Sequence, residues 1–202
     1  MAKIICVANR KGGVGKTTLA TNLAVALNNK GKSILIDADE QQSAFKWANQ
    51  RDDIECITIH SDLLEKLEQL DKEYEYILID VAGRASTIFR EALLVSDKLI
   101  VPTQPSLLDL QVLDYMQEKV KTAKQTNENL KAYVLINRAA VRTTELKDAI
   151  EFIAEFDQFK LLKTVLFERK QFRDAIVESK SVTEMNASKA KDELNQLIIE
   201  LL

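Results

Sequence analysis

A glycine-rich segment near the amino terminus, Lys11-Gly12-Gly13-Val14-Gly15-Lys16-Thr17-Thr18, carries residue types that bind phosphate groups. Its three glycines allow backbone N–H groups to converge on phosphate oxygens without interference from Cβ atoms. Lys16 can reach the β- and γ-phosphates of a nucleoside triphosphate, and the Thr17 hydroxyl can bind Mg²⁺. The nucleotide contacts predicted in this loop are Gly12, Gly13, Val14, Gly15, Lys16, Thr17 and Thr18.

The loop departs from the usual pattern G-x-x-x-x-G-K-[ST] at its first position, where this chain has Arg10. The alternative is a glycine turn that only joins a strand to a helix. An apolar run before the loop and a helical pattern after it favour phosphate binding, because the helix dipole and its free N–H groups would face the anion.

Acidic residues follow two other apolar runs. Tyr76–Asp80 consists of four apolar-type residues and a terminal aspartate, the pattern of a strand whose carboxylate holds a water bound to Mg²⁺. Combined with the phosphate loop, this pattern predicts a magnesium site at Thr17 and Asp80. Asp37 and Asp39 follow another apolar run, and their alternative role is to cap the next helix.

Short apolar runs alternate with longer amphipathic stretches along the whole chain, which predicts a strand–helix repeat. The predicted helices include Lys16–Lys30, Ser106–Lys124 with Ser106 and Asp109 as its capping pair, and Thr144–Phe156. Most of the strand-like runs are continuous Ile, Leu and Val, as expected for strands buried on both faces. These strands are predicted over Ile4–Ala8, Ser33–Asp37, Glu55–Ile59, Tyr76–Asp80, Lys98–Pro102, Ala132–Asn137 and Leu161–Phe167.

These elements predict a single α/β domain over residues 1–202, with a mostly parallel, doubly wound sheet flanked by helices, and the phosphate loop after its first strand makes this a P-loop NTPase fold. In such sheets ligands bind beyond the carboxyl ends of the strands. Chemistry is therefore expected after Ala8, Asp37, Asp80, Pro102 and Asn137.

Composition excludes several classes of protein. The 202 residues include 28 Lys and Arg against 31 Asp and Glu, a net charge of −3, which excludes a uniformly basic nucleic-acid binder but not a local basic patch. Cys6 and Cys56 are far apart, so a disulfide scaffold, a four-cysteine zinc site and an iron–sulfur cluster within one chain are excluded. The sequence shows neither a signal segment nor a run of 18 apolar residues, and a cytoplasmic protein is expected.

The run Lys11–Thr17 resembles the deviant phosphate loop of the ParA/MinD class of P-loop ATPases, and the similarity extends over nearly the whole chain. The chain is most similar to short ParA-type plasmid partition ATPases. The resemblance implies ATP and Mg²⁺ as cofactors and a dimer that encloses two nucleotides. Lys11 would then contact the phosphates of the partner subunit, since two facing triphosphates need extra cations. The alternative for Lys11 alone is a solvated loop lysine.

The resemblance also implies roles for residues beyond the loop. Asp39 matches an aspartate that supports hydrolysis and contacts the hydrated Mg²⁺, with Asp37 as a supporting acid, although Glu40 replaces the family's proline. Asn137 matches a residue that reads the adenine edge, with Arg138 beside it, and an ordinary turn is the alternative. The predicted catalytic residues are Lys11, Lys16 and Asp39, and the predicted metal site comprises Thr17, Asp39 and Asp80.

Two further segments match the family. Gly83 stands where a switch that senses the γ-phosphate would bend, and Arg84 is either a phosphate or interface contact or an exposed arginine. Phe167–Glu184 resembles the loop and helix that close the nucleotide site.

The segment from Lys160 to Lys191 is basic, with eight basic residues and four acids. It carries a net charge of +4 on a chain whose remainder carries −7, which favours a sequence-independent contact with the DNA backbone. The alternative is an ordinary solvated helical face. Near the carboxyl terminus Glu193 and Glu200 border an apolar stripe, which favours packing in the core over a membrane anchor. The stripe comprises Leu194, Leu197, Ile198 and Leu201.

The function expected from these features is that of a ParA-like ATPase, cytoplasmic and associated with the nucleoid. It would dimerise on ATP, bind nonspecific DNA through the basic C-terminal segment, and segregate a plasmid with a centromere-binding adaptor protein. Two alternatives remain: a MinD-like regulator that cycles on a membrane, and a ParA-like positioner of a protein cargo such as a chemoreceptor cluster or microcompartment.

Overall fold

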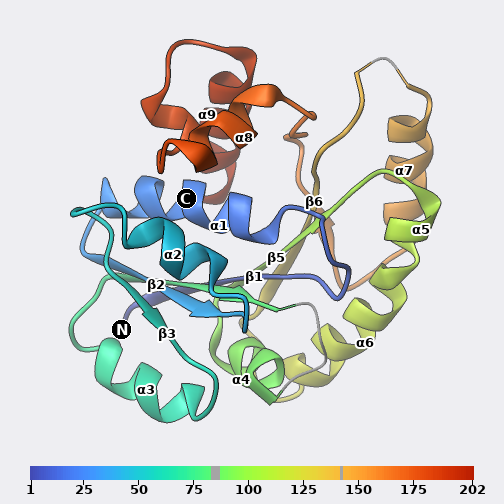
Figure 1. Ribbon diagram of the computed structural model, residues 1–202. Coiled ribbons are helices and arrows are strands. Elements are labelled where there is room, and N and C mark those ends of the chain that lie inside the picture. Colours follow the sequence, from blue (N-terminus) through green and yellow to red (C-terminus); the bar gives the residue numbers. More distant parts are fainter. Residues whose placement is uncertain (83–86, 142) are drawn as a thin grey trace.

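The protein is built on a parallel sheet with the strand order β3-β2-β4-β1-β5-β6-β7 (Figure 1). The structure is a computed structural model and describes residues 1–82, 87–141 and 143–202. All strand pairings among these residues are parallel. The strands are β1 (Lys3–Ala8), β2 (Ser33–Ala38), β3 (Cys56–Thr58), β4 (Tyr76–Val81), β5 (Lys98–Thr103), β6 (Lys131–Ile136) and β7 (Lys160–Leu161).

Helices cover both faces of the sheet, as the predicted α/β class requires (Figure 1). One face carries α1 (Lys16–Asn28), α2 (Ser43–Ala48), α8 (Lys170–Val177) and α9 (Lys189–Leu201), with the short 3₁₀ helix η1 (Val182–Glu184) between the last two. The other face carries α3 (Leu63–Leu70), α4 (Thr87–Val95), α6 (Val112–Lys124) and α7 (Glu145–Ile153), and α5 (Leu107–Leu110) lies between β5 and α6.

Alternate residues of each strand serve two separate hydrophobic cores. In β1, Ile5 and Val7 pack beneath α1, whereas Ile4 and Cys6 pack on the opposite face. Because both faces are buried, the strands show no polar alternation, and this explains why they read as continuous apolar runs. The predicted fold class is confirmed.

The strand predicted over Leu161–Phe167 is wrong, because β7 comprises only Lys160 and Leu161. The backbone N–H groups of Lys163 and Thr164 donate to the Glu200 carboxylate, at 2.8 and 3.0 Å, and not to a neighbouring strand. A side chain of α9 thus interrupts the strand, although the N–H groups of Leu162 and Leu166 still donate to the Val134 and Ile136 carbonyl oxygens of β6, at 2.9 and 3.0 Å.

The helix predicted over Ser106–Lys124 is divided in two, since α5 ends at Leu110 and α6 begins at Val112. The predicted cap is present: the Asp109 N–H donates to the Ser106 hydroxyl oxygen at 3.3 Å. Ser106 therefore starts the short helix α5 and not one long helix.

The apolar stripe of α9 lies in the core cluster that also contains α1, as predicted. Leu194, Leu197 and Leu201 are buried, and Ile198 is half-buried against the same cluster. Among the described residues, no helix combines the length and apolarity needed to cross a bilayer.

We predict that Leu197→Ala destabilises the protein by about 2–5 kcal/mol, because it removes a fully buried side chain and leaves a cavity. Ile199 lies on the same helix but is 80% exposed, so Ile199→Ala is the matched control and should cost no more than about 0.5 kcal/mol. Urea unfolding of both variants measures the difference, and equal losses would contradict the placement of α9.

Candidate nucleotide-binding site

The glycine loop lies between β1 and α1 at the carboxyl edge of the sheet. Gly13 and Gly15 have left-handed backbones, with φ of 76° and 89°. A Cβ atom on Gly15 would lie 2.4 Å from Nδ2 of Asn137, which is closer than any real contact. Gly15 is therefore required both by its backbone conformation and by the approach of a side chain from the end of β6.

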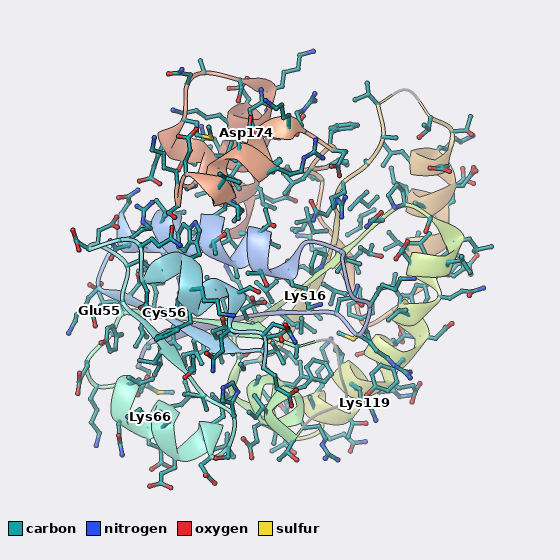
Figure 2. All side chains as sticks on the ribbon, viewed as in Figure 1. Lys16, Glu55, Cys56, Lys66, Lys119 and Asp174 are labelled. Carbon is teal, nitrogen blue, oxygen red and sulfur yellow. The ribbon has the colours of Figure 1, made fainter. Side chains whose placement is uncertain are left out.

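Lys16 and Thr17 form the first turn of α1, immediately after the loop. The Lys16 ammonium donates to the Lys11 carbonyl oxygen at 3.1 Å. Burial lowers the pKa of Lys16, and the carboxylates of Asp80 and Asp39 oppose that shift. In Figure 2 the labelled Lys16 lies where α1 meets the glycine loop. The main cation of the loop is thus half-buried beside two acids.

Asp80, near the end of β4, is 1% exposed, and neither of its carboxylate oxygens has a hydrogen-bond partner among the described residues. Burial raises the pKa of Asp80 to about 7; Asp37 and Asp39 add to the shift, whereas Thr17 and Lys16 oppose it. A buried carboxylate without a donor is costly unless a ligand satisfies it.

The donor set around Asp80 fits Mg²⁺. Thr17, Asp39 and Asp80 supply oxygen atoms, the type of ligand that Mg²⁺ prefers. The described part of the chain contains no cluster of three His, Cys, Asp or Glu side chains that could enclose a metal. Mg²⁺ characteristically binds in this way, through one or two carboxylates together with waters and phosphates.

Asp37 and Asp39 have different surroundings, although both follow β2 closely in the sequence. Asp37 is fully buried, and its oxygens accept hydrogen bonds from the backbone N–H groups of Asp39 and Phe45 at 3.0 and 2.9 Å. Asp39 is half-buried, accepts from the Gln41 N–H and lines the cavity. The alternative role in helix capping therefore applies to Asp37, and Asp39 is the acid that can meet a ligand.

The chain after β6 holds the glycine loop in place. The Asn137 amide donates to the Val14 carbonyl oxygen at 2.7 Å, and Arg138 donates to the Gly13 carbonyl oxygen at 2.8 Å. Arg138 has a left-handed backbone, with φ of 56°. The structure therefore assigns both residues a supporting contact with the loop, which the sequence did not predict. The adenine contact of Asn137 stays a prediction.

A cavity of about 530 Å³ brings most of the predicted site residues together. Its floor is formed by predicted residues: Gly12, Gly13, Gly15, Lys16, Thr17, Thr18, Asp39, Asn137 and Arg138. Three predicted residues do not line it. The Val14 side chain is buried away from the cavity, Asp80 lies beneath it, and Lys11 lies outside it.

The opposite wall of the cavity consists of residues that the sequence did not identify one by one. The apolar lining residues outside the predicted set are Leu19, Leu166, Phe167, Phe172, Ile176 and Leu194. Asn22 of α1 also lines the cavity. The predicted closing segment Phe167–Glu184 was the sequence signal for Phe167, Phe172 and Ile176, whereas Leu194 was predicted only as part of the apolar stripe near the carboxyl terminus. Gly83 and Arg84 lie outside the described residues.

Much of the charge of the basic segment is balanced locally. Among the described residues, exposed cations without an ion pair include Lys160, Lys163 and Lys189. The paired ones are Arg169 with Glu193 (2.5 Å), Arg173 with Glu168 (2.6 Å), Lys170 with Asp174 (3.5 Å) and Lys180 with Glu178 (2.8 Å). Exposed pairs contribute little energy, so Lys170, Arg173 and Lys180 remain able to meet an external phosphate, whereas the side chain of Arg169 is only 20% exposed.

The fold and the site define a class of protein. A central strand leads through a left-handed glycine loop into a helix that begins with Lys-Thr, and an adjacent strand carries a buried, unpartnered aspartate. This is the arrangement of a P-loop nucleotide-binding domain.

The chain belongs to the CobQ/CobB/MinD/ParA nucleotide-binding domain family, whose model matches residues 5–182. It is 30% identical over 208 residues to maintenance of carboxysome distribution protein A of Halothiobacillus neapolitanus, covering 98% of this chain and 95% of that protein. It is 27% identical over 213 residues to the sporulation initiation inhibitor protein Soj of Bacillus subtilis, covering 82% and 84%. The resemblance to the ParA/MinD class is confirmed.

Solved structures share the fold. Apo McdA of Cyanothece superposes with a TM-score of 0.83 at 17% identity over 100% of both chains. A putative plasmid partition protein of Borrelia burgdorferi bound to AMPPNP superposes with a TM-score of 0.79 at 23% identity, covering 98% of both chains.

We predict that Gly15→Ala destabilises the protein by about 2 kcal/mol or more, because alanine is strained at this φ and its Cβ would displace Asn137. Gly12→Ala is the matched control, since a Cβ there meets nothing within 4 Å. Chemical denaturation without nucleotide compares the two, and equal stability would contradict the close approach of Asn137 to the loop.

Proposed function

We propose that residues 1–202 act as one ATPase domain that binds ATP with Mg²⁺, dimerises on it and then binds nonspecific DNA on the nucleoid, where it positions a cargo. The observation that carries this proposal is the different placement of two lysine side chains of one loop. Lys16 lies in the cavity, whereas Lys11 lies outside it with a side chain 42% exposed. A lysine on the outer rim of the loop is available to a second subunit.

In this proposal the chain's own residues bind the phosphates and orient the reaction. Backbone N–H groups of the loop and the Lys16 ammonium hold the triphosphate, and Thr17 and Asp80 provide oxygen ligands for Mg²⁺, which neutralises the charge that develops during transfer. Asp39 orients the attacking water from the edge of the cavity. Lys11 of each subunit adds a cation at the phosphates of the other.

The surface beside Lys11 suits contact with a second copy. Leu107 and Leu108 of α5 are 62% and 71% exposed, and α5 lies next to the loop because Asp109 pairs with Lys11. Burial of these leucines by a second subunit would add apolar area to a contact otherwise made by charges.

The adaptor protein that stimulates hydrolysis would determine which cargo is positioned. We propose a plasmid held by a centromere-binding adaptor, as for ParA-type partition proteins. A protein cargo is the second candidate, because the relative that matches nearly the whole chain at 30% identity is a carboxysome distribution protein. Isolation of the adaptor distinguishes the two candidates. An adaptor that binds a specific DNA site indicates a plasmid cargo, and an adaptor that binds a protein assembly indicates a protein cargo.

We predict that Asp39→Ala lowers ATP turnover about 100-fold or more while ATP-dependent dimers persist, because the variant loses the acid that orients water but keeps the phosphate contacts.

Lys11→Ala should bind ATP and lose the stimulated rate, since its cation acts only across the dimer. Turnover is measured as phosphate release with and without the adaptor.

Glu40→Ala is the control for these variants. Glu40 is next to Asp39 but is exposed and outside the cavity, so its removal should change turnover less than about twofold. Wild-type turnover of Asp39→Ala or Lys11→Ala would contradict the proposed catalytic roles.

We predict ATP-dependent DNA binding that weakens steeply with salt. Replacing Lys170, Lys180 and Lys189 by glutamine should lower the slope of log K against log salt by about 3 per protomer, because each lysine displaces about one counterion. Random-sequence DNA with ATP, ADP or no nucleotide provides the assay, and vesicles of anionic lipid provide the parallel surface.

The charge control replaces three exposed lysines elsewhere: Lys66, Lys72 and Lys121. It removes the same charge from the opposite side of the sheet and should leave the slope unchanged. Binding to vesicles in place of DNA would support the membrane-cycling alternative, and equal slopes for both triple variants would remove the basic segment from the DNA contact.

A further inference from the structure

Lys11 is held by an acid of its own chain. Its ammonium nitrogen lies 3.6 Å from Oδ1 of Asp109 on α5. The Asp109 side chain is 12% exposed, so the pair joins a half-exposed lysine to a nearly buried carboxylate. This contact links the phosphate loop after β1 to the helix after β5.

Asp109 makes hydrogen bonds through its carboxylate and through its backbone. The Ser106 hydroxyl donates to Oδ2, and the Asp109 N–H donates back to the Ser106 hydroxyl oxygen. The Asp109 carbonyl oxygen accepts from the Thr103 hydroxyl at 3.4 Å. The contact of Ser106 with Oδ2 leaves Oδ1 directed at Lys11.

The backbone of Lys11 is fixed as well. Its N–H donates to the Asn9 side chain at 2.9 Å, and the Asn9 amide donates to the Pro102 carbonyl oxygen at 2.8 Å. The Lys11 carbonyl oxygen accepts from Lys16. With both ends of the pair anchored, the flexible stem of Lys11 is the part that can move without disturbing the loop.

We infer that Asp109 is a latch that holds Lys11 in cis and delays dimerisation until nucleotide is bound. This inference rests on the proposed function, because it takes Lys11 to act on the phosphates of a second subunit. One ammonium group cannot satisfy Asp109 and those phosphates together, so each dimer requires two such pairs to break. The triphosphate, with more negative charge than one carboxylate, competes for Lys11 successfully.

The latch predicts a gain of function. Asp109→Asn keeps the shape of the side chain and its contact with Ser106 but removes the charge that holds Lys11. A partly exposed ion pair changes an equilibrium constant by up to about fivefold, and two pairs break in each dimer. The protein concentration at half-dimerisation in AMPPNP and Mg²⁺ should therefore fall between about 2-fold and 30-fold.

Asp114→Asn is the matched control. Asp114 lies five residues further on, is exposed, and forms no ion pair within the described ranges, so the variant removes the same charge from the neighbouring helix. It should dimerise like the wild type. Sedimentation velocity across a series of protein concentrations measures all three proteins.

A second measurement, without nucleotide, tests the pair itself. Acetylation of Lys11 by an N-hydroxysuccinimide ester, followed by mass spectrometry, should be at least about twofold faster in Asp109→Asn than in the wild type or Asp114→Asn. Unchanged acetylation, or unchanged or weaker dimerisation of Asp109→Asn, overturns the latch. If the wild type fails to dimerise at any AMPPNP concentration, the proposed function fails instead, which is a different result.

Discussion

The geometry of the site depends on the left-handed backbone at Gly15 and the contact of Asn137 against it. Only glycine leaves room there, and the Asn137 amide uses that room to reach the Val14 carbonyl oxygen. Arg138 reaches the Gly13 carbonyl oxygen in the same way. The loop is thus held from β6, more than 120 residues further along the chain. A phosphate loop fixed by side chains keeps its N–H groups directed at the ligand, and little reorganisation is left for binding.

A second constraint is the concentration of charge at the carboxyl ends of β2 and β4. Asp37 and Asp80 are aligned in the register of these strands, and both are buried. Backbone N–H groups satisfy Asp37, whereas Asp80 has no donor in the described structure. Two acids with similar sequence surroundings therefore have different roles. The first stabilises the turn into α2, and the second is left with the unsatisfied charge that suits a site for Mg²⁺.

The wall above the cavity is attached by apolar and polar contacts. Ala175, Val182 and Leu194 are fully buried in the core cluster that also contains residues of α1. Glu168 bridges Arg138 and Arg173, and Arg51 binds both Asp53 and Glu184. A buried polar contact also anchors the segment: Asn22 of α1 accepts from the Ser181 hydroxyl and the Val182 N–H.

The sequence by itself determined the α/β class, the phosphate loop with Lys16 and Thr17, and the acid at Asp80, because continuous apolar runs and glycine spacing are local features with a direct physical meaning. Its prediction of strand Leu161–Phe167 was wrong beyond Leu161, because the Glu200 carboxylate from α9 accepts hydrogen bonds from the N–H groups of Lys163 and Thr164 and interrupts the pairing with β6. Only the tertiary structure decided that Asp37 caps while Asp39 faces the cavity, that Asn137 supports the loop, and that Lys11 rests on Asp109. These contacts depend on which side chains the fold brings within hydrogen-bond distance from distant parts of the sequence. No local sequence pattern encodes that geometry.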